Sequence, residues 1–171
     1  MEKNQHSLNI LMADDDADEF LLLREGLKES QINCDLSHVP DGDALMDYLQ
    51  GRGKFIDPGY GPRPLFILLD LNMTGKNGRD VLVEIKSIRE LKHIPVIIYT
   101  SSTDEEDVRR CYAMGANSYI IKPAGWDQLI HMIISLFSYW TRTVRLPKVE
   151  SMHPPKRNTD QELPMRLDHA V

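Results

Sequence analysis

Polar residues that could do chemistry stand at the ends of four separate apolar runs in this chain of 171 residues. They are Asp14, Asp15, Asp70, Thr100 and Lys122. Ligation by carboxylate oxygens alone suits Mg²⁺, which keeps several waters and takes a phosphate oxygen as a further ligand. An ammonium and a hydroxyl suit the oxygens of a phosphoryl group in transfer. Asp70 is then the candidate nucleophile, which would form an acyl phosphate.

Electrostatics supports the same interpretation if the three carboxylates lie together. At contact distance and an effective dielectric near 20, each pair of carboxylates repels by roughly 4 kcal/mol, so such a site needs a cation. Each residue alone has an ordinary alternative, because acidic runs often cap helices and single lysines often lie on surfaces. Their joint placement at the ends of apolar runs is what favours a site.

The elements that must position these residues alternate along the chain. Short apolar runs predict strands, and apolar residues at helical spacing predict helices between them. The expected strands are residues 8–13, 34–39, 65–69, 95–100 and 116–121, and the expected helices are 18–29, 44–49, 81–88, 102–114 and 126–140. Five strands alternating with five helices imply an α/β fold with a doubly wound parallel sheet. In such a sheet the ligand site lies beyond the carboxyl ends of the strands.

Two helix boundaries carry specific signals. Ser102 with Glu105, and Thr103 with Glu106, form overlapping capping-box patterns that predict the start of the fourth helix. Gly115 predicts its end. Between residues 51 and 64, glycine and proline recur throughout, which predicts a long loop before the third strand.

Composition is that of one ordinary globular domain, with 42% hydrophobic and 27% charged residues. We expect an N-terminal lead over residues 1–7, a domain over 8–141 and a C-terminal extension over 142–171. A net charge of −6 without a basic stripe argues against nucleic-acid binding, and no segment is long enough to span a membrane. Two cysteines, Cys34 and Cys111, outside any metal-binding pattern favour a reduced, cytoplasmic protein, with a disulfide between them as the alternative.

These residues together resemble the receiver domain of bacterial two-component response regulators. The resemblance covers about residues 8–141. It is carried by Asp14-Asp15, Leu69-Asp70 with Met73 and Gly78, Thr100, and Lys122-Pro123. The long loop before the third expected strand, and the lack of an output domain, resemble the stand-alone regulators that partner bacterial phytochrome histidine kinases.

The resemblance implies a flavodoxin-like sheet of order 2-1-3-4-5 with helices on both faces. It implies that a histidine kinase phosphorylates Asp70, with Mg²⁺ held by Asp15, Asp70 and the backbone carbonyl of Asn72, and by Asp14 through water. Thr100 and Lys122 would bind the phosphoryl oxygens. The peptide bond between Lys122 and Pro123 would be cis.

The resemblance also implies a conformational output. Tyr119 matches an aromatic residue whose rotamer follows Thr100 when that hydroxyl moves to the phosphate; an ordinary half-buried strand tyrosine is the alternative. Ser101 matches a small residue that leaves the site open, and Asn72 and Ser102 occupy positions that tune hydrolysis of the acyl phosphate. The protein would catalyse only its own phosphorylation and dephosphorylation, and would signal through the surface of the fourth helix, fifth strand and fifth helix.

The sequence departs from the family pattern at three places near the site. Thr74 stands where proline is usual, Asn77 where an acid is common, and Asp16-Ala17 where Asn-Pro is frequent. These changes alter the stiffness of the loops, but no chemical group is missing.

Two other classes of protein remain as alternatives. A Mg²⁺-dependent phosphohydrolase with an Asp nucleophile typically needs a second Asp two residues later, where this chain has Asn72. A nucleotide- or flavin-binding domain of similar topology would need a phosphate loop after the first strand. There, Asp14, Asp15 and Asp16 would repel phosphate without a cation.

The last helix has more apolar positions than one sheet face needs. On a helical wheel the apolar positions from Trp126 to Trp140 span roughly 220°, about twice the arc required. The residues sufficient for the core are Leu129, Ile130, Ile133, Phe137 and Trp140. The surplus residues are Met132, Leu136 and Tyr139. We expect them, together with Trp140 at the end of the strip, to contribute to a homodimer interface through the last two helices. Docking of the C-terminal extension on the same strip is the alternative.

Overall fold

The computed structural model describes residues 8–56 and 63–146. The expected N-terminal lead over 1–7, part of the loop before the third strand (57–62) and residues 147–171 of the expected C-terminal extension lie outside the described residues.

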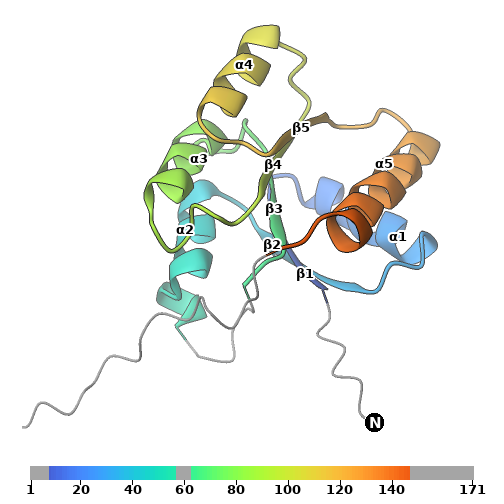
Figure 1. Ribbon diagram of the computed structural model, residues 1–171, viewed down its shortest axis with the longest axis horizontal. Helices are drawn as coiled ribbons and strands as arrows, with labels where there is room; N and C mark the ends of the chain where they lie inside the picture. The colour runs from blue at the N-terminus through green and yellow to red at the C-terminus, as the bar shows by residue number, and fades with distance from the viewer. Residues whose placement is uncertain (1–7, 57–62, 147–171) are drawn as a thin grey trace, which may run out of the picture.

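Five parallel strands form one sheet in the order β2-β1-β3-β4-β5, which confirms the expected α/β fold (Figure 1). The strands are β1 (Leu8–Ala13), β2 (Cys34–Val39), β3 (Phe66–Leu69), β4 (Val96–Thr100) and β5 (Ser118–Ile121). Strand β3 is buried along its whole length, as expected of a central parallel strand covered on both faces. In register, Leu69 of β3 lies beside Ala13 of β1 and Ile98 of β4, so these strands end at one edge of the sheet.

Helices cover both faces of this sheet (Figure 1). They are α1 (Ala17–Glu29), α2 (Gly42–Gln50), the 3₁₀ turn η1 (Gly53–Phe55), α3 (Gly78–Ser87), α4 (Glu105–Ala113), α5 (Trp126–Ser138) and the π turn η2 (Tyr139–Thr143). Helices α2, α3 and α4 share one apolar cluster with alternate strand residues, and α1 and α5 share the other. Side chains alternate along each strand, so both clusters contain residues from the same strands.

Helix α4 begins differently from the sequence prediction. Its N-cap is Asp104, whose carboxylate accepts the N–H of Glu106 at 2.9 Å, and neither predicted capping box forms. The Ser102 hydroxyl donates instead to Asp107, one turn further along, at 2.8 Å. The predicted cap residues therefore belong to the loop between β4 and α4, and that loop is longer than expected.

Part of the prediction for the apolar residues of α5 was wrong. Leu136, expected to be surplus, is buried. Trp140 is buried as expected of a core residue and packs against Phe66 of β3 with ring centroids 5.9 Å apart, so it does not form an exposed interface residue. Of the residues expected to be surplus, Met132 is half-buried against the same cluster and Tyr139 is exposed, at 52%. The expectation of a regular helix to Trp140 was wrong, because the π turn beginning at Tyr139 changes the direction in which side chains point.

The described chain continues to pack beyond this π turn. Val144 and Leu146 both lie against the apolar cluster of α1 and α5. Within residues 8–56 and 63–146, none of the helices is long and apolar enough to cross a membrane.

Both cysteines are free thiols in different layers. Cys34 packs with the α1 and α5 cluster, and Cys111 is buried in the cluster of α2, α3 and α4, so the alternative of a disulfide between them is wrong. Burial raises the pKa of Cys34 to about 11 and also raises the pKa of Cys111.

We expect both thiols to react slowly in the native protein, because the thiolate is the reactive form and burial disfavours it. At about pH 8.5, where an ordinary thiol is half ionised, a chromogenic disulfide reagent should modify the native protein much more slowly than the denatured protein. Reaction of Cys34 at the same rate in both states would contradict the assigned environment.

Candidate functional site

The four strand ends named by the sequence do converge on one edge of the sheet. Asp14 follows β1, Asp70 follows β3, Thr100 ends β4 and Lys122 follows β5, and these four strands are consecutive neighbours. Each apolar run thus delivers its polar residue to the edge where ligands bind in parallel α/β sheets.

Asp14, Asp15 and Asp70 form an acidic cluster. One carboxylate oxygen from each lies within 4.8 Å of the others. Asp14 and Asp70 are buried, at 1% and 6% exposure, while Asp15 is exposed. The Oδ1 atom of Asp70 is buried without a hydrogen-bond partner among the described residues. Oxygen donors with an unsatisfied buried acceptor fit a divalent cation such as Mg²⁺.

Lys122 partly neutralises this cluster. Its Nζ lies 2.7 Å from Oδ2 of Asp14 and 3.6 Å from Oδ2 of Asp70. Burial alone would lower the pKa of Lys122, but the hydrogen bond and charge of Asp14, together with the charge of Asp70, raise the pKa above its usual value. Lys122 is therefore a permanent cation beside the candidate nucleophile.

Asp14 is fixed by neighbours on two elements. Its Oδ1 accepts the N–H of Asp16 at 3.0 Å, and its backbone carbonyl accepts the Nε2–H of His38 at 2.8 Å. The His38 ring stacks on Phe20 of α1 with centroids 4.8 Å apart. Burial raises the pKa of Asp14, although Lys122 and the N–H of Asp16 oppose that shift.

The sequence analysis missed His38. A signal existed, because a parallel neighbour of the first strand must bring its own last residues to the same edge. His38 stands directly before the last residue of β2 and pairs in register with Met12 of β1.

The turn after Asp70 is held close to the site. A Cβ added to Gly78 would lie 2.0 Å from the carbonyl oxygen of Asp70, so only glycine fits where α3 begins. The N–H of Gly78 also donates to the carbonyl of Leu71 at 3.2 Å. On the other side, the N–H of Thr74 donates to Oδ2 of Asp15 at 2.9 Å. The turn thus connects the candidate nucleophile to both α3 and the exposed acid of the cluster.

Thr100 and Tyr119 both contact the loop residue Ser102. Thr100 is fully buried, and its Oγ1 is 3.5 Å from the N–H of Ser102. The Tyr119 hydroxyl donates to the Ser102 carbonyl at 3.0 Å. Burial raises the pKa of Tyr119, so this phenol is a neutral donor. The candidate hydroxyl of the site and the candidate switch aromatic are therefore linked through one loop residue.

Other residues named from the sequence lie in the expected loops. Asn72 is exposed two residues after Asp70, and Ser101 is exposed directly after β4. One expectation is corrected: the Lys122–Pro123 peptide bond is trans, since no cis bond occurs among the described residues. Trans is the lower-energy isomer for a residue before proline, and Lys122 reaches Asp14 in this geometry.

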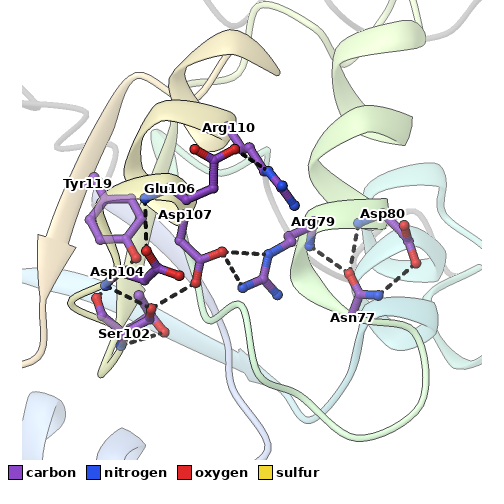
Figure 2. A network of polar contacts seen from close by, with 10 residues as sticks. Asn77, Arg79, Asp80, Ser102, Asp104, Glu106, Asp107, Arg110 and Tyr119 are labelled. Atoms are coloured by element: carbon purple, nitrogen blue, oxygen red, sulfur yellow. Dashed lines mark hydrogen bonds and ion pairs between the residues drawn. The ribbon is translucent and has the colours of Figure 1, made fainter.

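A second polar cluster beside the site was also missed by the sequence analysis. Arg79 of α3 forms an ion pair with Asp107 of α4, and Asp107 accepts the Ser102 hydroxyl (Figure 2). Nothing in the local sequence signals a pair separated by 28 positions on two different helices.

Comparisons with known proteins agree with this geometry. The family model of the response regulator receiver domain matches residues 10–134. The response regulator Rcp1 of Synechocystis sp. is 40% identical over 146 residues, which make up 85% of this chain and 97% of Rcp1. The crystal structure of Mn²⁺-bound Rcp1 has a TM-score of 0.73 and 40% identity, covering 82% of this chain and 99% of that chain.

Two further solved structures are similar. A response regulator in red light signaling of R. palustris has a TM-score of 0.79 and 34% identity, covering 82% of this chain and 99% of that chain. The phosphorylated cyanobacterial phytochrome response regulator RcpA has a TM-score of 0.75 and 35% identity, covering 83% of this chain and 99% of that chain.

Replacing Lys122 with Met should destabilise the protein when no divalent cation is present. The change leaves buried carboxylates without their ammonium, and breaking a buried ion pair in this way costs about 3 kcal/mol of unfolding free energy. Urea denaturation with and without Mg²⁺ measures the effect. Because a ligand of the native state stabilises it, Mg²⁺ should stabilise Lys122→Met more than it stabilises the wild type.

Lys28→Met is a suitable control, because Lys28 pairs with Glu25 on the exposed face of α1. This control should change the unfolding free energy by no more than about 0.5 kcal/mol, with the wild-type response to Mg²⁺. An equal Mg²⁺ increment for Lys122→Met and the wild type would show that Lys122 does not neutralise the cluster.

Proposed function

Because the chain belongs to the family of response regulator receiver domains, we propose that Asp70 accepts a phosphoryl group from a histidine kinase. An oxygen of the Asp70 carboxylate forms the new bond to phosphorus while the bond from phosphorus to the histidine nitrogen of the kinase breaks. The observation that carries this proposal is Oδ1 of Asp70, which is buried without a hydrogen-bond partner among the described residues and lies beside Lys122 and two further carboxylates. That oxygen is the group left available for a reaction.

Different residues around Asp70 would bind the cation and the phosphoryl oxygens. Asp15, Asp70 and the backbone carbonyl of Asn72 would hold Mg²⁺, with Asp14 acting through water. When bound, Mg²⁺ neutralises the negative charge on the phosphoryl oxygens. Lys122 contributes a fixed positive charge to the same oxygens, and the buried Thr100 hydroxyl contributes a hydrogen bond.

The output is a change of surface. Thr100 moves toward the phosphoryl group and the Tyr119 ring follows, which alters the surface formed by α4, β5 and α5. The protein catalyses only its own phosphorylation and dephosphorylation, and the side chains of Asn72 and Ser102 tune the second reaction. The bond from Tyr119 to the Ser102 carbonyl supports this coupling, because it joins the aromatic ring to the loop that follows Thr100.

The proposed phosphodonor is the histidine kinase of a bacterial phytochrome. Support comes from the similar proteins, of which RcpA is a phytochrome response regulator and another acts in red light signaling. The two free thiols support a location in the reducing cytoplasm.

The proposed assembly is a homodimer through the edge formed by α4, β5 and α5. Exposed apolar side chains occur on each of these parts: Tyr112 on α4, Ile121 on β5 and Tyr139 after α5. A hollow between β5 and α5 is lined by Ile120, Met132, Leu136, Tyr139 and Trp140. Met132 and Tyr139 remain candidates for direct contact. The buried side chains of Leu136 and Trp140 would contribute mainly by forming the floor of the hollow.

Acetyl phosphate with Mg²⁺ should add one phosphoryl group to the full chain, and Asp70→Asn should abolish the addition. Intact-protein mass spectrometry measures the adduct. Asp16→Asn is the matched control, because Asp16 is exposed, caps α1 and is not one of the cluster's acids, so it should retain wild-type phosphorylation. No adduct at any Mg²⁺ concentration would overturn the proposal, and rapid turnover of diverse phosphate esters would favour a phosphohydrolase.

Light scattering after size exclusion should give a mass twice that of the 19.6 kDa chain. Ile121→Glu should shift the protein toward the monomer, because the change places a charge in the proposed apolar contact. Leu22→Glu, at an exposed site on α1, is the matched control and should remain dimeric. A protein that is monomeric both with and without phosphorylation would contradict the homodimer.

A further inference from the structure

The start of α3 packs directly against the phosphoacceptor turn. Gly78 packs against the Asp70 carbonyl so closely that no side chain fits, and Asn77 caps the helix by accepting the N–H groups of Arg79 and Asp80 at 3.0 Å each. Arg79 is the residue directly after this close contact. A shift of the Asp70 carbonyl would therefore displace Gly78, the residue next to Arg79.

From Arg79, a continuous chain of polar contacts leads to Tyr119 (Figure 2). The Nε–H and Nη2–H groups of Arg79 donate to Oδ1 of Asp107 at 3.2 and 2.7 Å. The other carboxylate oxygen, Oδ2, accepts the Ser102 hydroxyl at 2.8 Å. The Ser102 carbonyl then accepts the Tyr119 hydroxyl at 3.0 Å. This chain links α3, α4, the loop after β4, and β5 without passing through Thr100.

Burial distinguishes the Arg79–Asp107 pair from the pair of Arg110 and Glu106, which lies wholly on α4. The side chains of Arg79 and Asp107 are 31% and 15% exposed, whereas those of Arg110 and Glu106 are 64% and 49% exposed. An exposed helical pair contributes little to stability, and a less exposed charge with several donors contributes more. Hydrogen bonds from Arg79 and Ser102 hold the pKa of Asp107 below its usual range, so Asp107 stays ionised.

We propose that Arg79 is a positioning residue for Tyr119, acting through Asp107 and Ser102 as a second connection between the phosphoacceptor turn and the switch tyrosine. The ion pair fixes Ser102 where its carbonyl receives the Tyr119 hydroxyl. When the pair is lost, Ser102 is free to shift and Tyr119 loses its acceptor. This inference rests on the proposed phosphorylation of Asp70 for its consequence, but the contact itself exists in the unphosphorylated chain.

Linkage gives this contact a measurable effect on the phosphoryl site. If phosphorylation favours the Tyr119 position that is hydrogen-bonded to Ser102, then contacts that hold Tyr119 in this position must favour binding of a phosphoryl group by the same factor. Beryllium fluoride with Mg²⁺ is the probe, because it mimics the phosphoryl group on an aspartate and its binding is an equilibrium.

The test uses the full chain labelled with ¹³C at the hydroxyl-bearing carbon of tyrosine. Of its six tyrosine resonances, the one lost in Tyr119→Phe belongs to Tyr119. Arg79→Gln should shift that resonance in the unliganded protein and weaken beryllium fluoride binding about fivefold, at the low end of allosteric couplings. Asp107→Asn should act in the same direction, which guards against a defect peculiar to one variant.

Two controls separate positioning from a purely structural role. Arg110→Gln removes the exposed ion pair with Glu106 on α4. It should leave both the Tyr119 resonance and the affinity for beryllium fluoride at wild-type values. In a Tyr119→Phe background, Arg79→Gln should have no further effect on affinity, because the acceptor no longer has a donor to hold.

An unmoved Tyr119 resonance in Arg79→Gln, or a fivefold loss that persists in Tyr119→Phe, would overturn the inference. Failure of the proposed function looks different. In that case the wild type would bind no beryllium fluoride and take no phosphoryl group from acetyl phosphate, while the resonance of the unliganded protein would still report on the connection from Arg79 to Tyr119.

Discussion

Repulsion among three carboxylates at one edge of the sheet is the constraint on which this site depends. Asp14 and Asp70 are buried beside Asp15, and Lys122 supplies one positive charge to the group. At distances of about 4 Å and an effective dielectric near 20, each like-charge pair costs roughly as much as one attraction to Lys122 returns. The folded chain therefore holds an excess of negative charge that a bound divalent cation would relieve. Within this group, Oδ1 of Asp70 is buried without a hydrogen-bond partner among the described residues.

The sheet can hold this charge in place because its interior is fixed by packing. Strands β1, β3 and β4 are almost wholly buried, so their ends cannot separate to relieve the repulsion without disrupting both apolar clusters. The loops beyond the strand ends are less constrained. Polar contacts, at the N–H of Thr74 and the hydroxyl of Ser102, fix those loops. When the charge at Asp70 changes, we therefore expect the loops and α4 to move while the strands stay in position.

The sequence predicted the parts of this structure that depend on local pattern. Apolar runs ending in Asp14, Asp70, Thr100 and Lys122 marked both the strands and the site, because a strand and the residue at its end are contiguous. Contacts between helices were invisible, since Arg79 and Asp107 each resemble an ordinary surface charge and only the packing of α3 beside α4 pairs them.

Helix α5 was misjudged for a related reason. A helical wheel assumes one constant turn angle, and the π turn after Ser138 breaks that assumption, although Trp140 still packs against Phe66 in the core as the wheel predicted. Burial of Leu136 likewise depends on how α5 sits against the sheet, which no periodicity within the helix specifies.

Thr74 shows how one departure from the family pattern changes the connections of the site. Proline, usual at this position, has no N–H to donate, whereas the N–H of Thr74 donates to Asp15 at 2.9 Å. Asp15 is the exposed member of the acidic cluster, so it has the greatest freedom to reorient and gains most from a fixed donor. The carboxylate that a cation would meet first is thus oriented by the turn that follows Asp70. The acid that follows β1 is thus connected to the turn after β3 by a backbone N–H as well as by charge. The conformation of that turn and the binding of a cation to the acidic cluster therefore depend on each other.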